Sequence, residues 1–190
     1  MLREEGASLI ELMIGLALLG LVLLVGMPSL KSWLTSTQVR SAAESILAGL
    51  QTARAEAIRR NTQAIFKLTS TTGVPDWSVL ADDPTIAGIN LNVPVQSWSG
   101  GQAKNAIVGT SSSATQNYSN AIAGGTGMPA SVTFDSMGNV FNVGTDLTRI
   151  DVTNKADSSA TRLVLVVSAF GQIRMCNPAV SLASNPEGCQ

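Results

Sequence analysis

The chain has 190 residues, with 12 basic and 13 acidic side chains and no histidine. This length suits one globular domain plus a short additional segment, and the nearly balanced charge excludes a chain-wide basic field for nucleic acid. Because histidine, the commonest general base and metal ligand, is missing and no nucleophile motif replaces it, we expect no enzyme, no catalytic residue, no cofactor and no metal site.

The first feature along the chain is an uncharged stretch from Leu12 to Leu30. As a helix, its 19 residues would be about 28 Å long, close to the hydrocarbon thickness of a bilayer. An ordinary secretory signal is the alternative, but the stretch is longer than a usual signal core and no small-x-small cleavage site follows it. We therefore predict a membrane-spanning helix.

Glu11 borders this apolar stretch. A carboxylate near the centre of a bilayer costs roughly 2.5–3.5 kcal/mol, and less near the interface, so such a residue normally has a partner. If the chain is cut after Gly6, the new amine of Ala7 lies one helical turn before Glu11, where the helix dipole also favours a carboxylate. In a filament, the carboxylate could instead neutralise the amine of a neighbouring subunit. An interfacial Glu without a partner is the alternative.

Residues 6–12, GASLIEL, resemble the type III (prepilin) signal of type IV pilins and type II secretion pseudopilins. In that family a membrane peptidase cuts after the Gly, the new N-terminus is methylated, and a Glu lies four residues further on. The resemblance implies leader cleavage between Gly6 and Ala7, N-methylation of Ala7 and an assembly role for Glu11.

Two residues within the apolar stretch extend this resemblance. Gly20 and Pro28 fall where pilins carry a Gly and a Pro, and Pro28 is expected to kink the helix because it removes a backbone donor. The departures are Ala7 for the usual Phe, Ser8 for the usual Thr, and acidic residues at 4–5, which weaken the positive-inside signal.

Residues 31–61 continue as a predicted amphipathic helix. Apolar residues recur there at spacings of three and four, which is the period of a helix with one buried face. A coiled-coil dimer is the alternative, but the small residues in the stripe favour close packing on a sheet. Asn61 is a natural helix terminator. The stripe comprises Val39, Ala43, Ile46, Leu50, Ala53 and Ala57.

Residues 53–61, ARAEAIRRN, resemble the helix end of GspH/FimT-type minor pilins and pseudopilins, which leads straight into the first strand. The resemblance implies an α+β, pilin-like fold with a long N-terminal helix packed on an antiparallel β-sheet head. The expected parts are a leader at 1–6, a transmembrane and filament-core helix at 7–30, an amphipathic helix at 31–61 and a β-rich head at 62–190.

Alternating and apolar segments predict the strands of the head. The segment at 161–170 is the most apolar and is expected to be a central strand. Residues 109–130 are Ser, Thr, Asn and Gly with few large side chains, which indicates a long exposed loop. The predicted strands are 63–69, 77–81, 89–95, 106–108, 131–134, 147–152 and 161–170.

Cys176 and Cys189 are the two cysteines of the chain. Two thiols that close a short terminal loop indicate a disulfide and an oxidising compartment, whereas unpaired thiols in a reducing cytoplasm are the alternative. Such a bond would stabilise the tail by about 3 kcal/mol in the chain-entropy model. The resemblance favours a pilus subunit here, because type IV minor pilins often carry a terminal bridge that pseudopilins usually lack.

Residues 171–174, GQIR, follow the most apolar predicted strand. FimT-type members that contribute to DNA uptake carry a Gly-Arg-x-Arg element at this place. The chain matches it at Gly171 and Arg174, with Gln172 in place of the first Arg, which removes one phosphate contact. A solvated Arg174 that binds no DNA is the interpretation we favour. The basic residues that could extend a patch are Arg149, Lys155 and Arg162.

Taken together, the resemblances imply a minor pilin subunit of a type IV pilus that acts in pilus assembly or in a tip or priming complex. A DNA-binding minor pilin for natural transformation and a type II secretion minor pseudopilin are the alternatives. The expected partners are other major and minor pilins, the prepilin peptidase, the inner membrane and, for the second reading, DNA. The expected location is the inner membrane, with a single pass and the head in the periplasm, and the extracellular pilus.

Overall fold

The computed structural model describes the backbone of residues 8–113 and 117–189, and the side chains of these residues except 24–32 and 102. The predicted leader at 1–6 and the cleavage junction at Gly6 and Ala7 lie outside the described residues. The chain divides into two compact units, Met1–Leu34 and Thr35–Gln190, and each is treated by itself.

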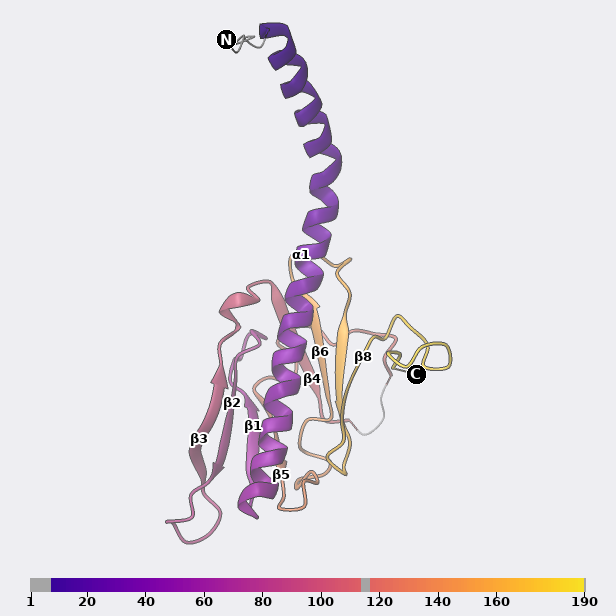
Figure 1. Ribbon diagram of the computed structural model, residues 1–190. Helices are drawn as coiled ribbons and strands as arrows, with labels where there is room; N and C mark the ends of the chain where they lie inside the picture. The colour runs from indigo at the N-terminus through magenta and orange to yellow at the C-terminus, as the bar shows by residue number, and fades with distance from the viewer. Residues whose placement is uncertain (1–7, 114–116, 190) are drawn as a thin grey trace, which may run out of the picture. The chain divides into compact units, whose positions relative to one another are not determined.

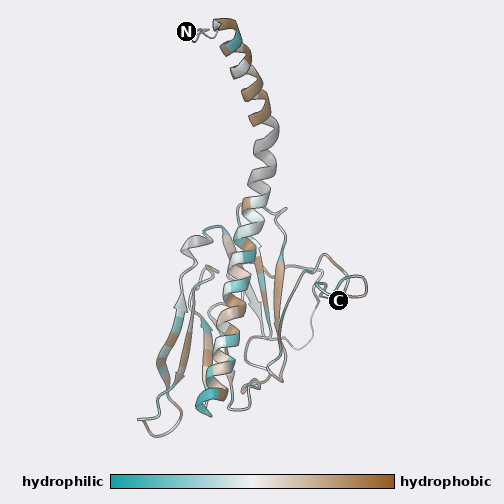
Figure 2. Ribbon diagram, in the orientation of Figure 1, coloured by the Kyte–Doolittle hydropathy of each residue, from teal (hydrophilic) through white to brown (hydrophobic). Residues whose placement is uncertain are grey.

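Helix α1 (Leu9–Arg60) contributes to both units. Its first turn begins at Ser8, whose carbonyl accepts hydrogen bonds from the amides of Glu11 at 3.0 Å and Leu12 at 3.2 Å. Hydrophobic residues dominate its first described stretch (Figure 2). Within the residues that the structure describes, no helix combines the length and the apolar character needed to cross a membrane. The anchor at 7–30 therefore stays a prediction.

Pro28 lies inside α1, but its side chain is outside the described part of the structure. The predicted kink at this residue stays a prediction.

The head-forming half of α1 buries one narrow stripe of small and apolar residues. All six residues of the predicted stripe, from Val39 to Ala57, have no exposed surface, and neither has Ala42. The helix ends at Arg60, and Asn61 adopts a left-handed conformation with φ of 53°, as expected for a helix terminator. The stripe packs on sheets of the same chain, so the coiled-coil alternative is not needed to explain it.

Two antiparallel sheets of four strands make up the rest of the head (Figure 1). This arrangement confirms the predicted α+β class, although the head holds two sheets. The first sheet has the order β3 (Leu91–Trp98), β2 (Trp77–Asp82), β1 (Ala64–Leu68) and β5 (Ala130–Phe134), and a 3-10 helix, η1 (Gly100–Gln102), follows β3. The second sheet has the order β4 (Ala106–Ser111), β6 (Arg149–Asn154), β7 (Leu163–Val167) and β8 (Ile173–Cys176).

Most predicted strands match observed strands within a few residues. The segment predicted as central contains β7, which lies between β6 and β8 in its sheet. The predicted loop at 109–130 is too long at both ends, because Gly109 to Ser111 belong to β4 and Ala130 belongs to β5. Strand β8 is missing from the prediction because its four residues, IRMC, contain Arg174 and show no clear alternation.

Close approach of α1 to the first sheet depends on Gly49. A Cβ atom at this position would lie 2.8 Å from Phe66 Cε2 and 3.0 Å from the Trp77 ring. The two rings themselves pack with their centroids 5.7 Å apart, and the Trp77 indole donates a hydrogen bond of 3.0 Å to Ser45 Oγ. Only a residue without a side chain lets the helix sit at this distance from the sheet.

We expect Gly49→Val to destabilise the head by about 1–3 kcal/mol, because the added isopropyl group overpacks a closed aromatic contact. The matched control is Gly101→Val, since nothing lies within 4 Å of a Cβ there. Urea unfolding of the full chain in detergent, followed by tryptophan fluorescence, measures both variants. Equal midpoints for the two variants would contradict the packing role of Gly49.

A charge cluster closes the C-terminal end of α1. The Glu56 carboxylate accepts hydrogen bonds from Arg59, at 2.6 and 3.1 Å, and from Arg60 at 2.8 Å. These two guanidinium groups lower the pKa of Glu56 from 4.5 to about 2. A folded-state pKa below the unfolded value stabilises the fold above the unfolded pKa, and this contribution is lost as the pH falls through the folded pKa.

The stability gap between the wild type and Glu56→Gln should therefore be constant above pH 5 and should shrink between pH 4.5 and about 2. Thermal unfolding at a series of pH values measures it. A gap that widens as the pH falls would show that Glu56 acts in another way.

Candidate functional site

The N-terminal part of α1 exposes large apolar side chains on every face. From Leu9 to Leu23, eleven Leu, Ile, Met and Val side chains are between 48 and 77% exposed. Gly15 and Gly20 lie in the same stretch, and a Cβ atom added to either would have nothing within 4 Å. A helix that is apolar all round is found in a membrane or in the core of an assembly. This stretch is the first candidate functional region.

Glu11 is the one charged residue between Ser8 and Leu30. It lies in the first turn of α1, where unpaired backbone N–H groups and the helix dipole favour a carboxylate. Its side chain is exposed. The predicted partner, the amine of Ala7, lies outside the described residues, so their pairing stays a prediction.

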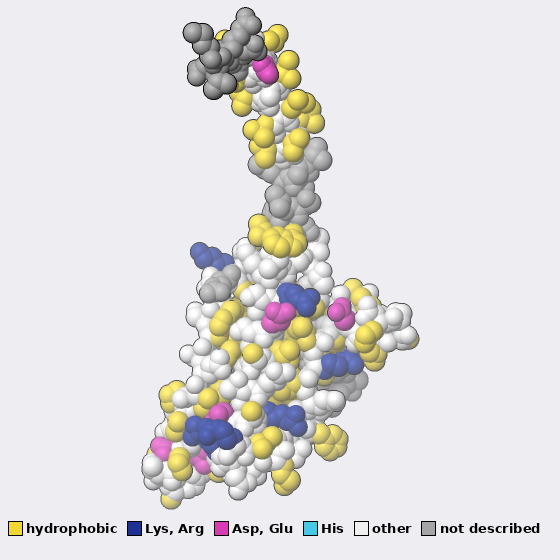
Figure 3. Space-filling model, in the orientation of Figure 1, with side chains coloured by type: hydrophobic (Ala, Val, Ile, Leu, Met, Phe, Trp, Pro, Cys, Tyr) yellow, Lys and Arg dark blue, Asp and Glu magenta, His cyan; other side chains and the backbone are white. Residues whose placement is uncertain are grey.

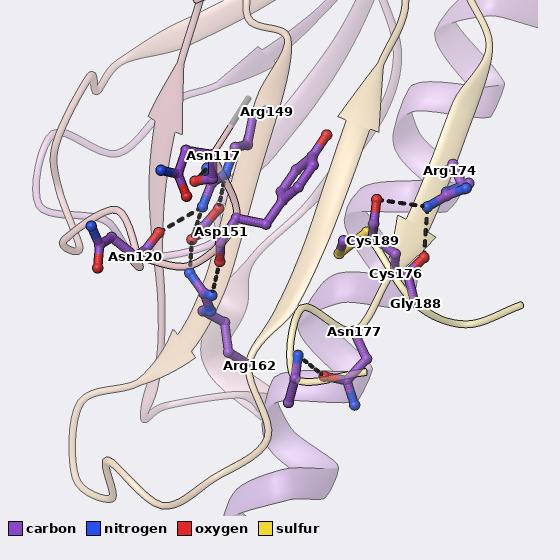
Figure 4. The surroundings of a disulfide bond; sticks show 12 residues. Asn117, Asn120, Arg149, Asp151, Arg162, Arg174, Cys176, Asn177, Gly188 and Cys189 are labelled. Atoms are coloured by element: carbon purple, nitrogen blue, oxygen red, sulfur yellow. Dashed lines mark hydrogen bonds and ion pairs between the residues drawn. A yellow bond between two sulfur atoms is a disulfide. The ribbon is translucent and has the colours of Figure 1, made fainter. Parts of the chain in front are cut away.

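The second candidate region is the C-terminal lobe, which we define as residues 117–122 together with 176–189. The structure contains the predicted disulfide between Cys176 and Cys189, with Cα atoms 5.1 Å apart (Figure 4). Both cysteines are buried, at 2 and 8% exposure, and Tyr118 and Val166 pack against them. The bond thus closes the C-terminal segment and also forms part of a small apolar cluster beneath residue 118.

Arg174 holds the end of the disulfide loop. It is an exposed residue of β8, but its Nη2 donates hydrogen bonds to the carbonyl of Gly188 at 2.6 Å and to that of Cys189 at 3.3 Å (Figure 4). The first role that the structure assigns to this guanidinium is therefore structural. Contact of Arg174 with DNA stays a prediction.

Gly171 and Gln172 belong to the tight turn between β7 and β8. Gly171 is buried with φ of +68°, and a Cβ there would collide with the carbonyl oxygen of Gly138. Glycine is therefore required by packing, whatever the turn binds. Gln172 is exposed, and its backbone N–H donates a hydrogen bond of 3.1 Å to Ser168 Oγ.

A buried ion triad, formed by Arg149, Asp151 and Arg162, holds the other half of the lobe. Asp151 is fully buried, and its two carboxylate oxygens accept hydrogen bonds from Arg149 Nε at 2.6 Å and Nη2 at 2.9 Å. Arg162 Nη1 adds a third bond of 2.8 Å. Burial makes such a network costly unless every member is satisfied, and these contacts satisfy it.

The remaining donors of the triad bind the backbone of residues 117–122 (Figure 4). Arg149 donates to the carbonyls of Asn117 and Asn120, Arg162 donates to that of Tyr118, and Asp151 accepts from the amide of Ile122. The Arg149 guanidinium also lies 5.0 Å from the centre of the Tyr118 ring, a cation–π distance. This part of the predicted exposed loop is thus fixed to the second sheet.

The triad also bears on the basic residues that could extend a patch around Arg174. Arg149 is only 4% exposed, and Arg162 is half-buried with a carboxylate partner, so neither extends a surface patch around Arg174. Lys155 is exposed. The signal for the triad was present in the sequence, because residues 149 and 151 share a face of one strand, but the partner at 162 depends on strand pairing.

Within the described residues, no group of three or more His, Cys, Asp and Glu side chains comes together in a way that could hold a metal ion.

Both a protein family and solved structures are similar to this chain. The sequence profile of the family described as Type II transport protein GspH matches residues 42–171. A crystal structure of the type IV minor pilin FimU from Pseudomonas aeruginosa strain PAO1 has a TM-score of 0.54 at 19% identity, covering 76% of this chain and 92% of that one. A crystal structure of the same protein in a second space group has a TM-score of 0.50 at 18% identity, covering 74% of this chain and 94% of that one. This structural likeness shows a shared fold and confirms the predicted pilin-like class. No curated protein matches the chain.

Replacing Asp151 by Asn should destabilise the head by about 3–5 kcal/mol, because the buried Arg149 and the half-buried Arg162 lose their counter-charge. Residues 117–122 should also loosen. Since Tyr118 is the single tyrosine of the chain, 3-fluorotyrosine labelling gives one ¹⁹F NMR signal that reports their order.

The control for Asp151→Asn is Glu44→Gln, which removes the partner of Arg40 in an exposed pair and should cost less than about 1 kcal/mol. If both variants unfold at the same urea concentration and leave the fluorine signal unchanged, the triad does not hold the lobe.

Proposed function

Because the chain belongs to the GspH family of type II transport proteins, we propose that it is a minor pilin subunit of a type IV pilus. It acts in pilus assembly, or in a tip or priming complex, together with other major and minor pilins. Its place is the inner membrane before assembly and the pilus afterwards, with the head outside the cytoplasm.

The observation that carries this proposal is the uncovered apolar stretch of α1. Its eleven large side chains from Leu9 to Leu23 are exposed in the single chain. At about 1.5–3 kcal/mol for each side chain, full burial is worth on the order of 20 kcal/mol. Two environments offer that burial, the hydrocarbon of a membrane and a bundle of like helices. A subunit that moves from the first into the second keeps its apolar surface covered throughout assembly.

Glu11 fixes the axial alignment of this helix against the helix of a neighbouring subunit. Cleavage after Gly6 exposes the amine of Ala7, and the methylated amine stays positively charged. A carboxylate in an apolar bundle needs a counter-charge, since an isolated buried charge is strongly unfavourable. The amine of a neighbouring subunit supplies it only when the two helices are aligned at the correct height.

The C-terminal disulfide agrees with a head that folds in an oxidising compartment. Disulfides persist in the periplasm and outside the cell and are rare in the cytosol. The bond between Cys176 and Cys189, with Arg174 on the carbonyl of Gly188, keeps the last residues attached to the second sheet.

A minor pseudopilin of type II secretion is the second candidate, and the description of the matching family favours it. Deletion of the gene separates the two. Loss of surface pili with normal enzyme export supports the pilus, and loss of exported enzymes with normal pili supports the secretion system.

We expect Glu11→Ala to reduce incorporation into filaments by at least about tenfold while the head stays folded, because the register contact is lost and the exposed Glu11 is not part of the core cluster of the head. Sheared filaments are probed by immunoblot, and mass spectrometry of the membrane fraction checks that the leader has been removed.

The matched control is Glu44→Ala, which removes another exposed carboxylate from α1. Normal incorporation of Glu11→Ala, or retention of Met1 on the wild type in cells with an active prepilin peptidase, would refute the proposed mechanism.

A further inference from the structure

One end of the head carries a group of exposed apolar side chains that the proposed function does not use. They lie on two connections, residues 136–145 between β5 and β6 and residues 168–172 between β7 and β8. We call this group the distal apolar surface. Its members are Met137 at 77% exposure, Phe141 at 55%, Val143 at 66% and Phe170 at 80%.

The two connections form one continuous surface. The amide of Val140 donates to the carbonyl of Ala169 at 3.0 Å, and Gly171 packs directly on the carbonyl of Gly138. A hollow of about 380 Å³ lies beside these contacts and is lined mainly by apolar side chains, among them Val143 and Val167. Of the four exposed residues, Val143 lines the hollow, together with Val140, Val166 and Ala169 and with four polar residues, Ser112, Asp146, Thr148 and Ser168. The distal apolar surface thus includes a concavity that can accept a protruding side chain.

This surface lies at the end of the head where α1 ends. Arg54, in the last two turns of the helix, donates from Nε to the carbonyl of Gly138 at 3.0 Å. The opposite end is marked by Thr35, the first residue of this unit, whose hydroxyl bonds to Asp157. The helix between residues 35 and 60 is about 38 Å long, so the distal apolar surface is far from the point where α1 enters the head. Hydrophobic side chains are visible along the lower edge of the head in Figure 3.

Few charged side chains lie at this surface, which limits what it can bind. The sequence holds no Asp, Glu, Lys or Arg from 136 to 145 or from 163 to 173. Asp146 lines the hollow but is only 6% exposed, and Arg54 is bound to the carbonyl of Gly138. Nucleic acid and anionic lipid both require basic residues. The cores of protein–protein interfaces, in contrast, are depleted of charge and enriched in aromatic residues and Met. The composition therefore favours an apolar protein surface.

We propose that the distal apolar surface is the docking site for the neck of an adjacent pilin-type subunit, meaning the helical turns that directly follow its apolar anchor. The proposal rests on the proposed function. Subunits that leave the same membrane enter a filament in parallel, so the distal end of one head meets the anchor side of the next. Such a head-to-tail contact is heterologous and propagates along a fibre.

This chain shows what such a neck presents. Directly before its head, Trp33 is 64% exposed and Leu34 is 53% exposed. An adjacent subunit with apolar residues at the same place would insert them into the hollow beside Val143. In such a contact, one subunit contributes its distal apolar surface and the adjacent subunit contributes its neck.

Photocrosslinking in the full chain tests which molecule binds to the distal apolar surface. Benzoylphenylalanine replaces Phe170 in cells that assemble pili, and the control places it at Lys155, an exposed residue near the opposite end of the head. We expect Phe170 to crosslink to a peptide of another pilin that directly follows its apolar segment, and Lys155 not to do so. Crosslinks to lipid, to DNA or to a different region of a partner would overturn the proposal.

Substitutions on the distal apolar surface test how much this contact contributes to entry into filaments. The double variant Val143→Asp with Phe170→Asp should enter filaments about tenfold less than the wild type, as expected for loss of a hot spot. The control, Leu182→Asp, places a charge at another exposed apolar residue, 43% exposed, and should stay within about twofold. Near-ultraviolet circular dichroism of the purified chains confirms that each head is folded.

The outcomes separate the two proposals. If the wild type enters filaments and the double variant enters equally well, the docking site is wrong and the proposed function stands. If the wild type itself is absent from filaments, the proposed function is wrong, and so is the docking site that rests on it.

Discussion

The head depends on one narrow stripe of α1 that both sheets use as their common surface. The residues from Val39 to Ala57 that form it are fully buried, and they belong to a single core cluster together with side chains of both sheets. Small residues make this arrangement possible, because Ala53, Ala57 and above all Gly49 let the strands approach the helix axis closely. Larger residues would separate the sheets from the helix, and the two sheets share no strand that could hold them together.

Around this core, polar contacts decide which segments stay attached. The Arg149–Asp151–Arg162 triad fixes residues 117–122, and the disulfide with Arg174 fixes the C-terminal segment. Both devices meet at Tyr118, which packs against the disulfide cluster and lies over the Arg149 guanidinium. Two segments that are poor in apolar residues are thereby held in place without a large core of their own.

The same chain leaves two apolar surfaces uncovered, the stretch of α1 from Leu9 to Leu23 and the distal apolar surface. A monomeric soluble protein rarely exposes such areas without a partner. For a subunit that leaves a membrane and enters a filament, both areas have a use, since the first is covered by lipid or by like helices and the second by an adjacent head. The proposed assembly role thus accounts for surface that would otherwise promote aggregation.

Local patterns in the sequence determined the long helix, its buried stripe, its end at Asn61, most strands and the pairing of Cys176 with Cys189, because each depends on the period or the spacing of nearby residues. The tertiary structure alone decided that the strands form two sheets, that β8 exists and that Arg149 and Arg162 turn inward to Asp151. It also decided that Gly171 and Arg174, which resembled parts of a DNA-binding element, have packing and loop-holding roles. These features depend on contacts between residues far apart in the chain, and a residue type has no fixed role until such contacts determine its burial and its partners.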